Sequence, residues 1–398
     1  MSWSKYSVED EKIPGISVFA IILLIVSLYV QSKLVFFLAI FFLSIVAMNQ
    51  LYLKKAGIGL LLENRVEKSH FFINENGKWT LTFQNEGYPI LKGEIKASFD
   101  IYIRPLDDTM EPSQSLYEIS IPFSIVSNQT KQIVLPFTAN MRGIARICQL
   151  EFHIPSLIGF GESVLKYNQL FKQVAVVYPQ PIPVKGLKEL VAIQQGVMVV
   201  PYSIYEDRLG QLGTRDYVPS DSFNRIHWKA SARKQTLQTK VFERISEKGW
   251  NLSINVANGY ALTGLLEPII SSITEFAYYA ANKQIPYSLC VNIRTTGTTP
   301  FFYVPKGEGK EHLQKVLEIL ASVDRQNSII PYERMLSFYN RHLAVQPYFL
   351  HAGIRTSTAN AFLQQLENNG IYLVELKIAD GQAVLTNFKT KNESRIRP

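Results

Sequence analysis

Cysteine is scarce in this 398-residue chain, and the two cysteines, Cys148 and Cys290, fall in different predicted domains. They provide no disulfide framework and no paired metal ligands. The six histidines also lack the close pairs that zinc sites use. We therefore expect no metal site and no cofactor.

Nucleotide-binding and hydrolase motifs are missing too. Residues 307–310 resemble a phosphate loop, but they lack its glycine spacing and the hydroxyl residue after the lysine. Gly159 and Gly161 form an isolated pair outside any strand-to-helix context. The chain has no Gly-x-Ser-x-Gly nucleophile elbow. The sequence predicts no catalytic residue.

The apolar content is high for a purely soluble protein, with 47% hydrophobic residues and a mean hydropathy of +0.03. The excess is concentrated near the N-terminus, in residues 13–30 and 34–53. A membrane-spanning helix needs about 20 mostly apolar residues. A cleaved signal peptide is disfavoured, because a second apolar run follows at once. Residues 13–53 therefore predict a two-helix transmembrane hairpin.

Basic residues flank this hairpin on both sides, whereas the turn between its helices carries only Lys33. The positive-inside rule then places both ends in the cytoplasm. The sequence predicts a multi-pass cell-membrane protein with a cytosolic tail (residues 1–12) and cytoplasmic main domains. The flanking cations are Lys5, Lys12, Lys54, Lys55, Arg65 and Lys68.

Short runs of alternating polar and apolar residues recur between positions 60 and 180. This pattern, with turn residues between the runs, is typical of an all-β, Ig-like sandwich. Proline-rich residues 181–212 are expected to form a linker over the surface or between domains. The clearest predicted strands are residues 78–83, 93–99, 117–121, 131–135 and 146–152.

Strand and helix patterns alternate from residue 248 to 380, followed by a predicted tail at 381–398. Such alternation is typical of an α/β domain with a parallel sheet, whose ligands gather at the carboxyl ends of the strands. The predicted strands are 252–257, 286–292, 347–351 and 371–376, and the predicted helices are 265–281, 309–322 and 357–368.

Residues 213–247, here called the signature segment, concentrate charged and aromatic side chains. One hypothesis is a hydrolase-like site formed by Asp221, Ser222, His227 and Ser231. A second is nucleic-acid binding by the segment's cations, although interleaved acids favour internal pairing. We favour a charged junction between the two domains, in which Asp221 or Ser222 caps a helical turn and Arg225 lies within pairing distance of Asp221.

The signature segment resembles that of the bacterial domain-of-unknown-function 58 family. The resemblance implies a membrane-anchored protein whose last domain is similar to a von Willebrand factor A (Rossmann-like) domain. It also implies partnership with a MoxR-type AAA+ ATPase and a transglutaminase-like membrane protein, with no nucleic acid expected. The matching residues are Arg215, Asp216, Tyr217, Pro219, Asp221, Arg225, Ile226, His227, Trp228, Lys229, Ala230, Ser231, Ala232, Arg233 and Leu237.

Two features depart from the family pattern. Ser220 stands where the family often has glycine. The adhesion-type metal site of such domains needs Asp-x-Ser-x-Ser after the first strand, because Mg²⁺ takes oxygen ligands. The corresponding loop carries Asn258, Tyr260 and Leu262 instead. We therefore expect a non-enzymatic interaction or assembly protein whose partner contacts do not use a metal.

Overall fold

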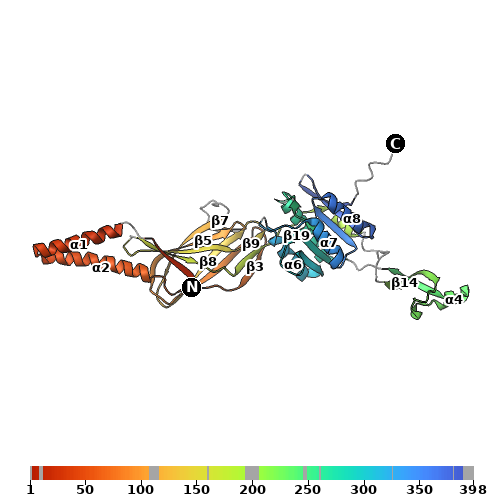
Figure 1. Ribbon diagram of the computed structural model, residues 1–398, viewed down its shortest axis with the longest axis horizontal. Helices are drawn as coiled ribbons and strands as arrows, with labels where there is room; N and C mark the ends of the chain where they lie inside the picture. Colours follow the sequence, from red (N-terminus) through yellow and green to blue (C-terminus); the bar gives the residue numbers. More distant parts are fainter. Residues whose placement is uncertain are drawn as a thin grey trace. The chain divides into compact units, whose positions relative to one another are not determined.

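The computed structural model describes residues 2–8, 12–106, 116–158, 161–192, 206–244, 249–259, 261–324, 326–379 and 381–388. The chain divides into two compact units, Met1–Tyr178 and Pro179–Pro398. Figure 1 shows the helices and strands of each.

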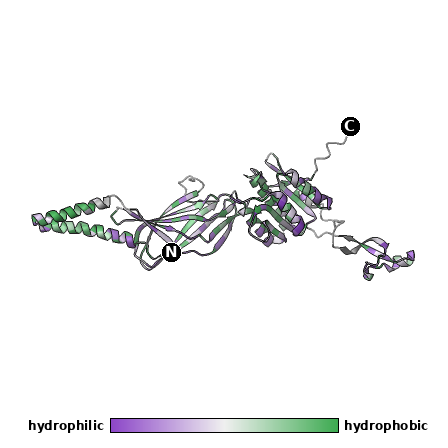
Figure 2. Cartoon of the chain, in the orientation of Figure 1, coloured by the Kyte–Doolittle hydropathy of each residue, from purple (hydrophilic) through white to green (hydrophobic). Residues whose placement is uncertain are grey.

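Two apolar helices lie near the N-terminus, α1 (Lys12–Val30) and α2 (Lys33–Lys55), and they pack against each other (Figure 1). Within the described part of the chain, α2 is the helix long and apolar enough to cross a membrane, with a window of mean hydropathy 2.3. Figure 2 shows the apolar character of both helices. Large side chains such as Leu34 (75% exposed) and Phe37 (69%) face outward. A lipid environment would cover such a surface.

Part of the segment predicted to be a cytosolic tail is a strand, which the sequence did not indicate. Strand β1 (Trp3–Val8) pairs antiparallel with β11 (Glu162–Tyr167) at the edge of a five-stranded sheet. The Nζ of Lys5 donates hydrogen bonds to the carbonyl oxygens of Lys54 (2.9 Å) and Ala56 (2.6 Å) at the end of α2. The segment before α1 is therefore tied to the segment after α2.

The rest of the first unit forms sandwich-like sheets, as predicted. The five-stranded sheet has the order β1-β11-β10-β5-β7, the four-stranded sheet β2-β4-β8-β6 and the small sheet β3-β12-β9. Trp79 and Phe83 of β4 share one core with Phe99 of β5 and Phe152 of β10. The strands are β2 (Leu60–Glu63), β3 (Glu67–Phe71), β4 (Asn76–Asn85), β5 (Ile90–Asp100), β6 (Ile103–Pro105), β7 (Leu116–Ile125), β8 (Gln129–Ala139), β9 (Gly143–Ala145), β10 (Ile147–Pro155) and β12 (Gln173–Val177).

The second unit contains a seven-stranded sheet with the order β13-β23-β22-β21-β16-β19-β20. Its neighbouring strands β22, β21, β16 and β19 are parallel, whereas β20 and β23 pair antiparallel with β19 and β22. The strands are β13 (Val184–Lys185), β16 (Trp250–Asn255), β19 (Tyr287–Arg294), β20 (Phe301–Gly307), β21 (Tyr348–Gly353), β22 (Tyr372–Ala379) and β23 (Gln382–Asn387).

Helices cover both faces of this sheet. Side chains of α5 (Leu266–Asn282) and α6 (Gly309–Ser322) pack with Leu252 and Leu289 on one face. Side chains of α7 (Tyr332–His342) and α8 (Ser357–Asn368) pack with Phe349 on the other. Helix α7 and strand β20 were not expected from the sequence.

The predicted linker and C-terminal tail both supply strands to this sheet, with β13 at its edge and β23 between β13 and β22, which the sequence did not indicate. Strand β13, from the start of the linker, pairs parallel with β23, from the tail. A short helix α3 (Leu187–Ala192) follows β13. Residues 193–205 of the predicted linker and the residues after 388 lie outside the described residues. The prolines of residues 181–212 predicted a linker and gave no sign that the chain joins a sheet directly after Pro183.

The buried face of the sheet that packs against α7 and α8 also carries polar side chains. Ser253 of β16 lies in register with His351 of β21, which lies in register with Glu375 of β22. The Tyr332 hydroxyl lies 2.8 Å from the Ser253 Oγ and 2.7 Å from the His351 Nδ1. Ser253 and His351 are each fully buried. The Tyr332 hydroxyl thus links Ser253 to His351, whereas the buried Nε2 of His351 has no hydrogen-bond partner among the described residues.

Candidate functional site

The signature segment begins in a long hairpin. Strand β14 (Glu206–Asp216) pairs antiparallel with β15 (Gln238–Arg244), and between them lie a 3-10 turn (Phe223–Arg225) and the short helix α4 (Trp228–Lys234). Ile226 is only 2% exposed and bridges to Thr239 of β15. This contact folds the connection back onto the hairpin.

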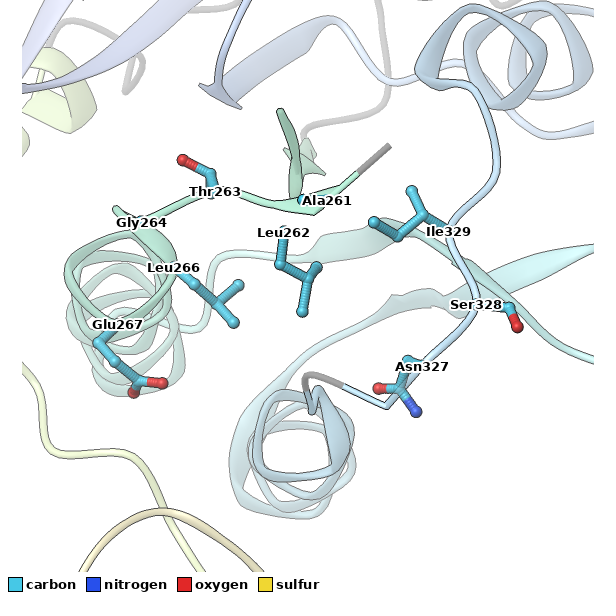
Figure 3. Close-up of a pocket in the computed structure, with 9 residues that line it drawn as sticks. All are labelled: Ala261, Leu262, Thr263, Gly264, Leu266, Glu267, Asn327, Ser328 and Ile329. Atoms are coloured by element: carbon cyan, nitrogen blue, oxygen red, sulfur yellow. The ribbon is translucent and has the colours of Figure 1, made fainter. Parts of the chain in front are cut away.

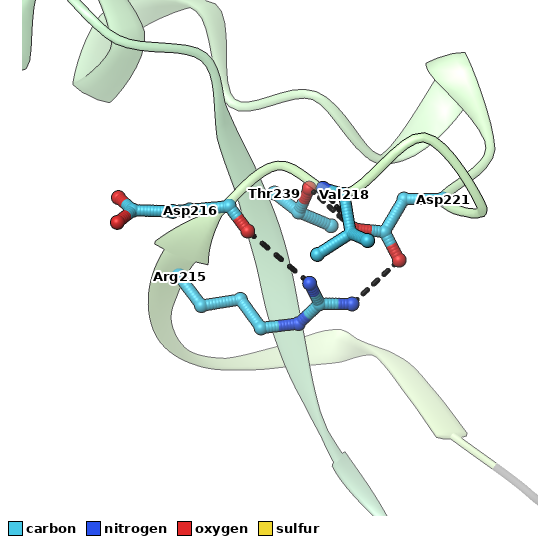
Figure 4. A network of polar contacts seen from close by, with 5 residues as sticks. All are labelled: Arg215, Asp216, Val218, Asp221 and Thr239. Atoms are coloured by element: carbon cyan, nitrogen blue, oxygen red, sulfur yellow. Dashed lines mark hydrogen bonds and ion pairs between the residues drawn. The ribbon is translucent and has the colours of Figure 1, made fainter.

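The Asp221 carboxylate holds the start of this connection through three groups (Figure 4). Its Oδ1 lies 2.5 Å from the Nη2 of Arg215, and its Oδ2 accepts from the backbone N–H of Val218 (3.1 Å) and from the Thr239 hydroxyl (3.0 Å). Arg215 also donates to the backbone carbonyl of Asp216 at 3.2 Å. The hydrogen bond from Arg215 lowers the pKa of Asp221. The cation that pairs with Asp221 is therefore Arg215. The sequence spacing had indicated Arg225 instead.

His227 is the N-cap of α4. Its Nδ1 accepts a hydrogen bond from the backbone N–H of Ala230 at 3.0 Å. The Ser231 hydroxyl donates to the carbonyl of His227 (3.0 Å) and accepts from the backbone N–H of Gln238 (2.9 Å). Neither Asp221 nor Ser222 caps a helix through its side chain, because Asp221 bonds back to Val218 and Ser222 makes no side-chain cap bond.

Three of the four residues of the hydrolase hypothesis, Asp221, His227 and Ser231, therefore serve local structure. Within the described hydrogen bonds of this segment, none joins the Ser231 hydroxyl to the His227 imidazole. A nucleophile and its base need such a bond or one that can form on substrate binding. The geometry favours a structural role for His227 and Ser231.

Gln238 is a site residue that the sequence did not reveal. It is fully buried, and its Nε2 donates to the Asp216 carboxylate at 2.5 Å. Lys234 in turn donates to the Gln238 Oε1 at 3.3 Å. The pairing depends on the strand register Asp216↔Gln238, which a local pattern does not encode.

Five further residues of the signature segment face outward. Phe223 is 71% exposed and Trp228 is 67% exposed, while Arg225, Lys229 and Arg233 are exposed cations. The ring of the half-buried Tyr217 lies 6.0 Å from that of Phe223. We call Phe223, Arg225, Trp228, Lys229 and Arg233 the tip surface. The contacts described above all stay inside the hairpin, and the predicted role as a domain junction stays a prediction.

The carboxyl edge of the sheet in the second unit carries amides. Strand β16 ends at Asn255, whose Oδ1 accepts from the Asn292 Nδ2 at 2.9 Å and whose Nδ2 donates to the Ile354 carbonyl at 2.6 Å. The Asn292 Oδ1 accepts from the backbone N–H of Val256 at 2.8 Å. The side-chain amides of Asn255 and Asn292 are thus engaged in hydrogen bonds within this edge.

The loop that the sequence predicted to have lost the ligands of an adhesion-type metal site follows as a small hairpin. Asn258 lies in β17 (Ala257–Asn258) and Leu262 in β18 (Ala261–Leu262), whereas Tyr260 lies outside the described residues. Among the described residues, no group of three His, Cys, Asp or Glu side chains is arranged to hold a metal.

An open hollow of about 700 Å³ lies beside this loop (Figure 3). Leu262, Leu266 and Ile329 supply its apolar wall. Glu267, in the first turn of α5, is its charged residue, and the full lining is Ala261, Leu262, Thr263, Gly264, Leu266, Glu267, Asn327, Ser328 and Ile329.

Comparisons with known proteins identify no family. No protein-family model and no curated protein match the chain. Among solved structures, it is similar to the CARDB domain of the PF1109 protein from Pyrococcus furiosus (12% identity, 30% of this chain and 91% of that chain, TM-score 0.18). It is also similar to the C-terminal domain of wzt (9%, 30% and 73%, 0.20) and to the sporulation control protein Spo0M from Bacillus subtilis (16%, 40% and 58%, 0.17). At these TM-scores the likenesses carry no argument.

Proposed function

We propose that this protein is a membrane-anchored, non-enzymatic interaction or assembly protein that works with a MoxR-type AAA+ ATPase in the cell envelope or in complex maturation. The observation that carries the proposal is the apolar helix pair, whose large side chains face outward along α2. A helix of this length and composition is suited to a bilayer.

Both helices span the membrane in this proposal. Strand β1 precedes α1 and strand β2 follows α2, and both belong to the same compact unit. A chain that leaves the sheets of this unit after β1 and rejoins them at β2 must run out and back, which supports a hairpin with both ends on one side. The basic flanks support the cytoplasmic side.

The second unit is proposed to be a von Willebrand factor A-like domain. In chain order its strands β16, β19, β20, β21 and β22 add on both sides of β16, and this doubly wound order supports the proposal. Asn255 and Asn292 stand at the carboxyl edge with their amides bonded to each other. Partner binding is therefore proposed to proceed without a metal ion at this edge.

The resemblance of the signature segment to the domain-of-unknown-function 58 family supports the choice of partners. These are a MoxR-type AAA+ ATPase and a transglutaminase-like membrane protein. The enzyme alternative is less well supported, because His227 and Ser231 hold the end of α4 through their own hydrogen bonds.

The test is co-purification of the full chain from crosslinked membranes with the ATPase encoded in the same genome. We expect the ATPase to be recovered in at least one of the ATP-, ADP- and nucleotide-free states. A matched control is an unrelated bilayer protein carrying the same tag. Failure to recover the ATPase in all three states would contradict the proposed function.

A further inference from the structure

The charge of the signature segment is unevenly distributed. Residues 222–242 contain five cations and no acid. The nearest acids before this run, Asp216 and Asp221, are bonded to Gln238 and to Arg215. The acids therefore serve the fold of the hairpin, and the following run keeps an excess of positive charge. The five cations are Arg225, Lys229, Arg233, Lys234 and Lys240.

Helix α4 orders part of this charge beside an aromatic side chain. Trp228 and Ala232 lie four positions apart, as do Lys229 and Arg233, and all four are exposed. Ser231 on the opposite side is buried and bonded to Gln238. Residues spaced by four share a helix face, so the outward side of α4 presents an indole next to two cations.

The exposed aromatics are costly to leave in water. Phe223 is 71% exposed and Trp228 is 67% exposed, and each is large enough to bury well over 100 Å² in an interface. Trp and Arg are also the residues that most often dominate the binding energy of protein interfaces. Their exposure beside cations indicates a binding surface rather than a solvated turn.

The surface is held in a fixed shape. His227 caps α4, the Ser231 hydroxyl ties it to β15, and Asp221 holds the preceding loop to Arg215. A preformed surface loses little conformational entropy on binding. A fixed shape helps a surface to recognise another folded protein, whereas binding to a lipid surface requires only charge and apolar side chains.

We propose that the tip surface binds an acidic surface on a protein partner. Trp228 and Phe223 bury apolar area there, while Lys229 and Arg233 face carboxylates. The proposal rests on the proposed function and specifies the chemistry of its partner. Opposite charge across an interface speeds association and selects the partner.

The experiment uses the full chain in its native membrane, with photoreactive benzoylphenylalanine at position 228 or 223. Tyr88, which is 50% exposed in the first unit, is the control position. We expect crosslinks from 228 and 223, and not from 88, to reach one protein within a segment rich in Asp and Glu. Lys229→Glu with Arg233→Glu should lower the yield more than about tenfold.

Two further variants make the result specific. Lys310→Glu with Lys315→Glu, two exposed cations of α6, should leave the yield unchanged. The Lys229→Glu, Arg233→Glu variant is called the reversed tip. Replacing the crosslinked acids of the partner by Lys should restore the crosslinking yield of this variant. Lys229→Gln with Arg233→Gln gives a milder change with an intermediate loss, and thermal unfolding identifies variants that fail to fold.

Crosslinks to lipid or nucleic acid, to a segment without excess acid, or to nothing would overturn the inference. An unchanged yield with the reversed tip would overturn it too. If the ATPase still co-purifies with the reversed-tip variant, the inference is overturned and the proposed function stands. Loss of the ATPase from the wild-type chain removes the proposed function itself.

Discussion

His227 accepts a hydrogen bond from Ala230 at Nδ1, so the proton of its neutral ring lies on Nε2. His227→Ala removes this cap and should destabilise the hairpin by about 1 kcal/mol. His227→Asn offers a preferred cap and should recover most of the loss. Hydrogen exchange at the Ala230 amide measures the effect. A loss of function without faster exchange would point back to a chemical role.

The Cys148 side chain reaches the surface, but its thiol is partly shielded from water and is a weak acid. Burial, and then the hydrogen bond to the Asp100 carboxylate at 3.0 Å, raises its pKa to about 12. Because the thiolate is the reactive form, alkylation at pH 8 should be slower than for an ordinary cysteine. Asp100→Asn should speed the reaction. Mass spectrometry of modified Cys148 gives the rate, and equal rates would contradict the assigned cause.

His351 introduces a dependence of stability on pH. Burial, and then the nearby charge of Arg355, lowers its pKa from 6.5 to about 3. The unfolded chain then takes up a proton before the folded chain does, so stability is complete above about pH 6.5 and declines as the pH falls toward 3. Between pH 7 and pH 5 this group should cost about 2 kcal/mol.

Chemical denaturation at the two pH values measures this loss. His351→Gln should remove that part of the dependence. His342→Gln, at an exposed histidine of α7, is the matched control and should keep it. The same loss in wild type and in the His351 variant would contradict the argument.

At the scale of elements, β1 and the helix pair depend on Lys5. Lys5→Met keeps the alkyl chain but leaves the carbonyls of Lys54 and Ala56 without their charged donor. Hydrogen bonds to charged groups contribute about 1.5–3 kcal/mol, so the variant should release β1 more readily. Limited proteolysis in detergent follows the release. Lys92→Met, at an exposed lysine of β5, is the control, and equal cleavage would contradict the prediction.

How well the sequence predicts each feature of the structure depends on how far apart in the chain the interacting residues lie. The helices at 12–55 and the sandwich strands follow from long apolar runs and period-two alternation, which are local. Strand β1 was hidden, because six residues with a lysine also fit a basic tail. The choice of Arg215 over Arg225 as the partner of Asp221, and the burial of Gln238, depend on the register of β14 and β15. No local spacing encodes that register.

At the scale of the whole molecule, the prediction concerns topology. In a Cys148→Ser background, Ser32→Cys places a thiol in the turn between α1 and α2. We expect a membrane-impermeant maleimide to label it in intact cells. Ser124→Cys, on an exposed position of β7, should be labelled only after permeabilisation. Labelling of Ser124→Cys in intact cells would reverse the orientation, and protection of Ser32→Cys would contradict the hairpin.

The pairing of β1 with β11 joins two strands that are synthesised at very different times. Trp3 leaves the ribosome long before Tyr167, the residue opposite it in the sheet. Both apolar helices are complete by then. In the proposed topology, the first residues therefore remain on the ribosome's side of the membrane until β11 is made. An N-terminal fusion that is carried across the bilayer should leave β11 as an open edge, and an open edge invites aggregation.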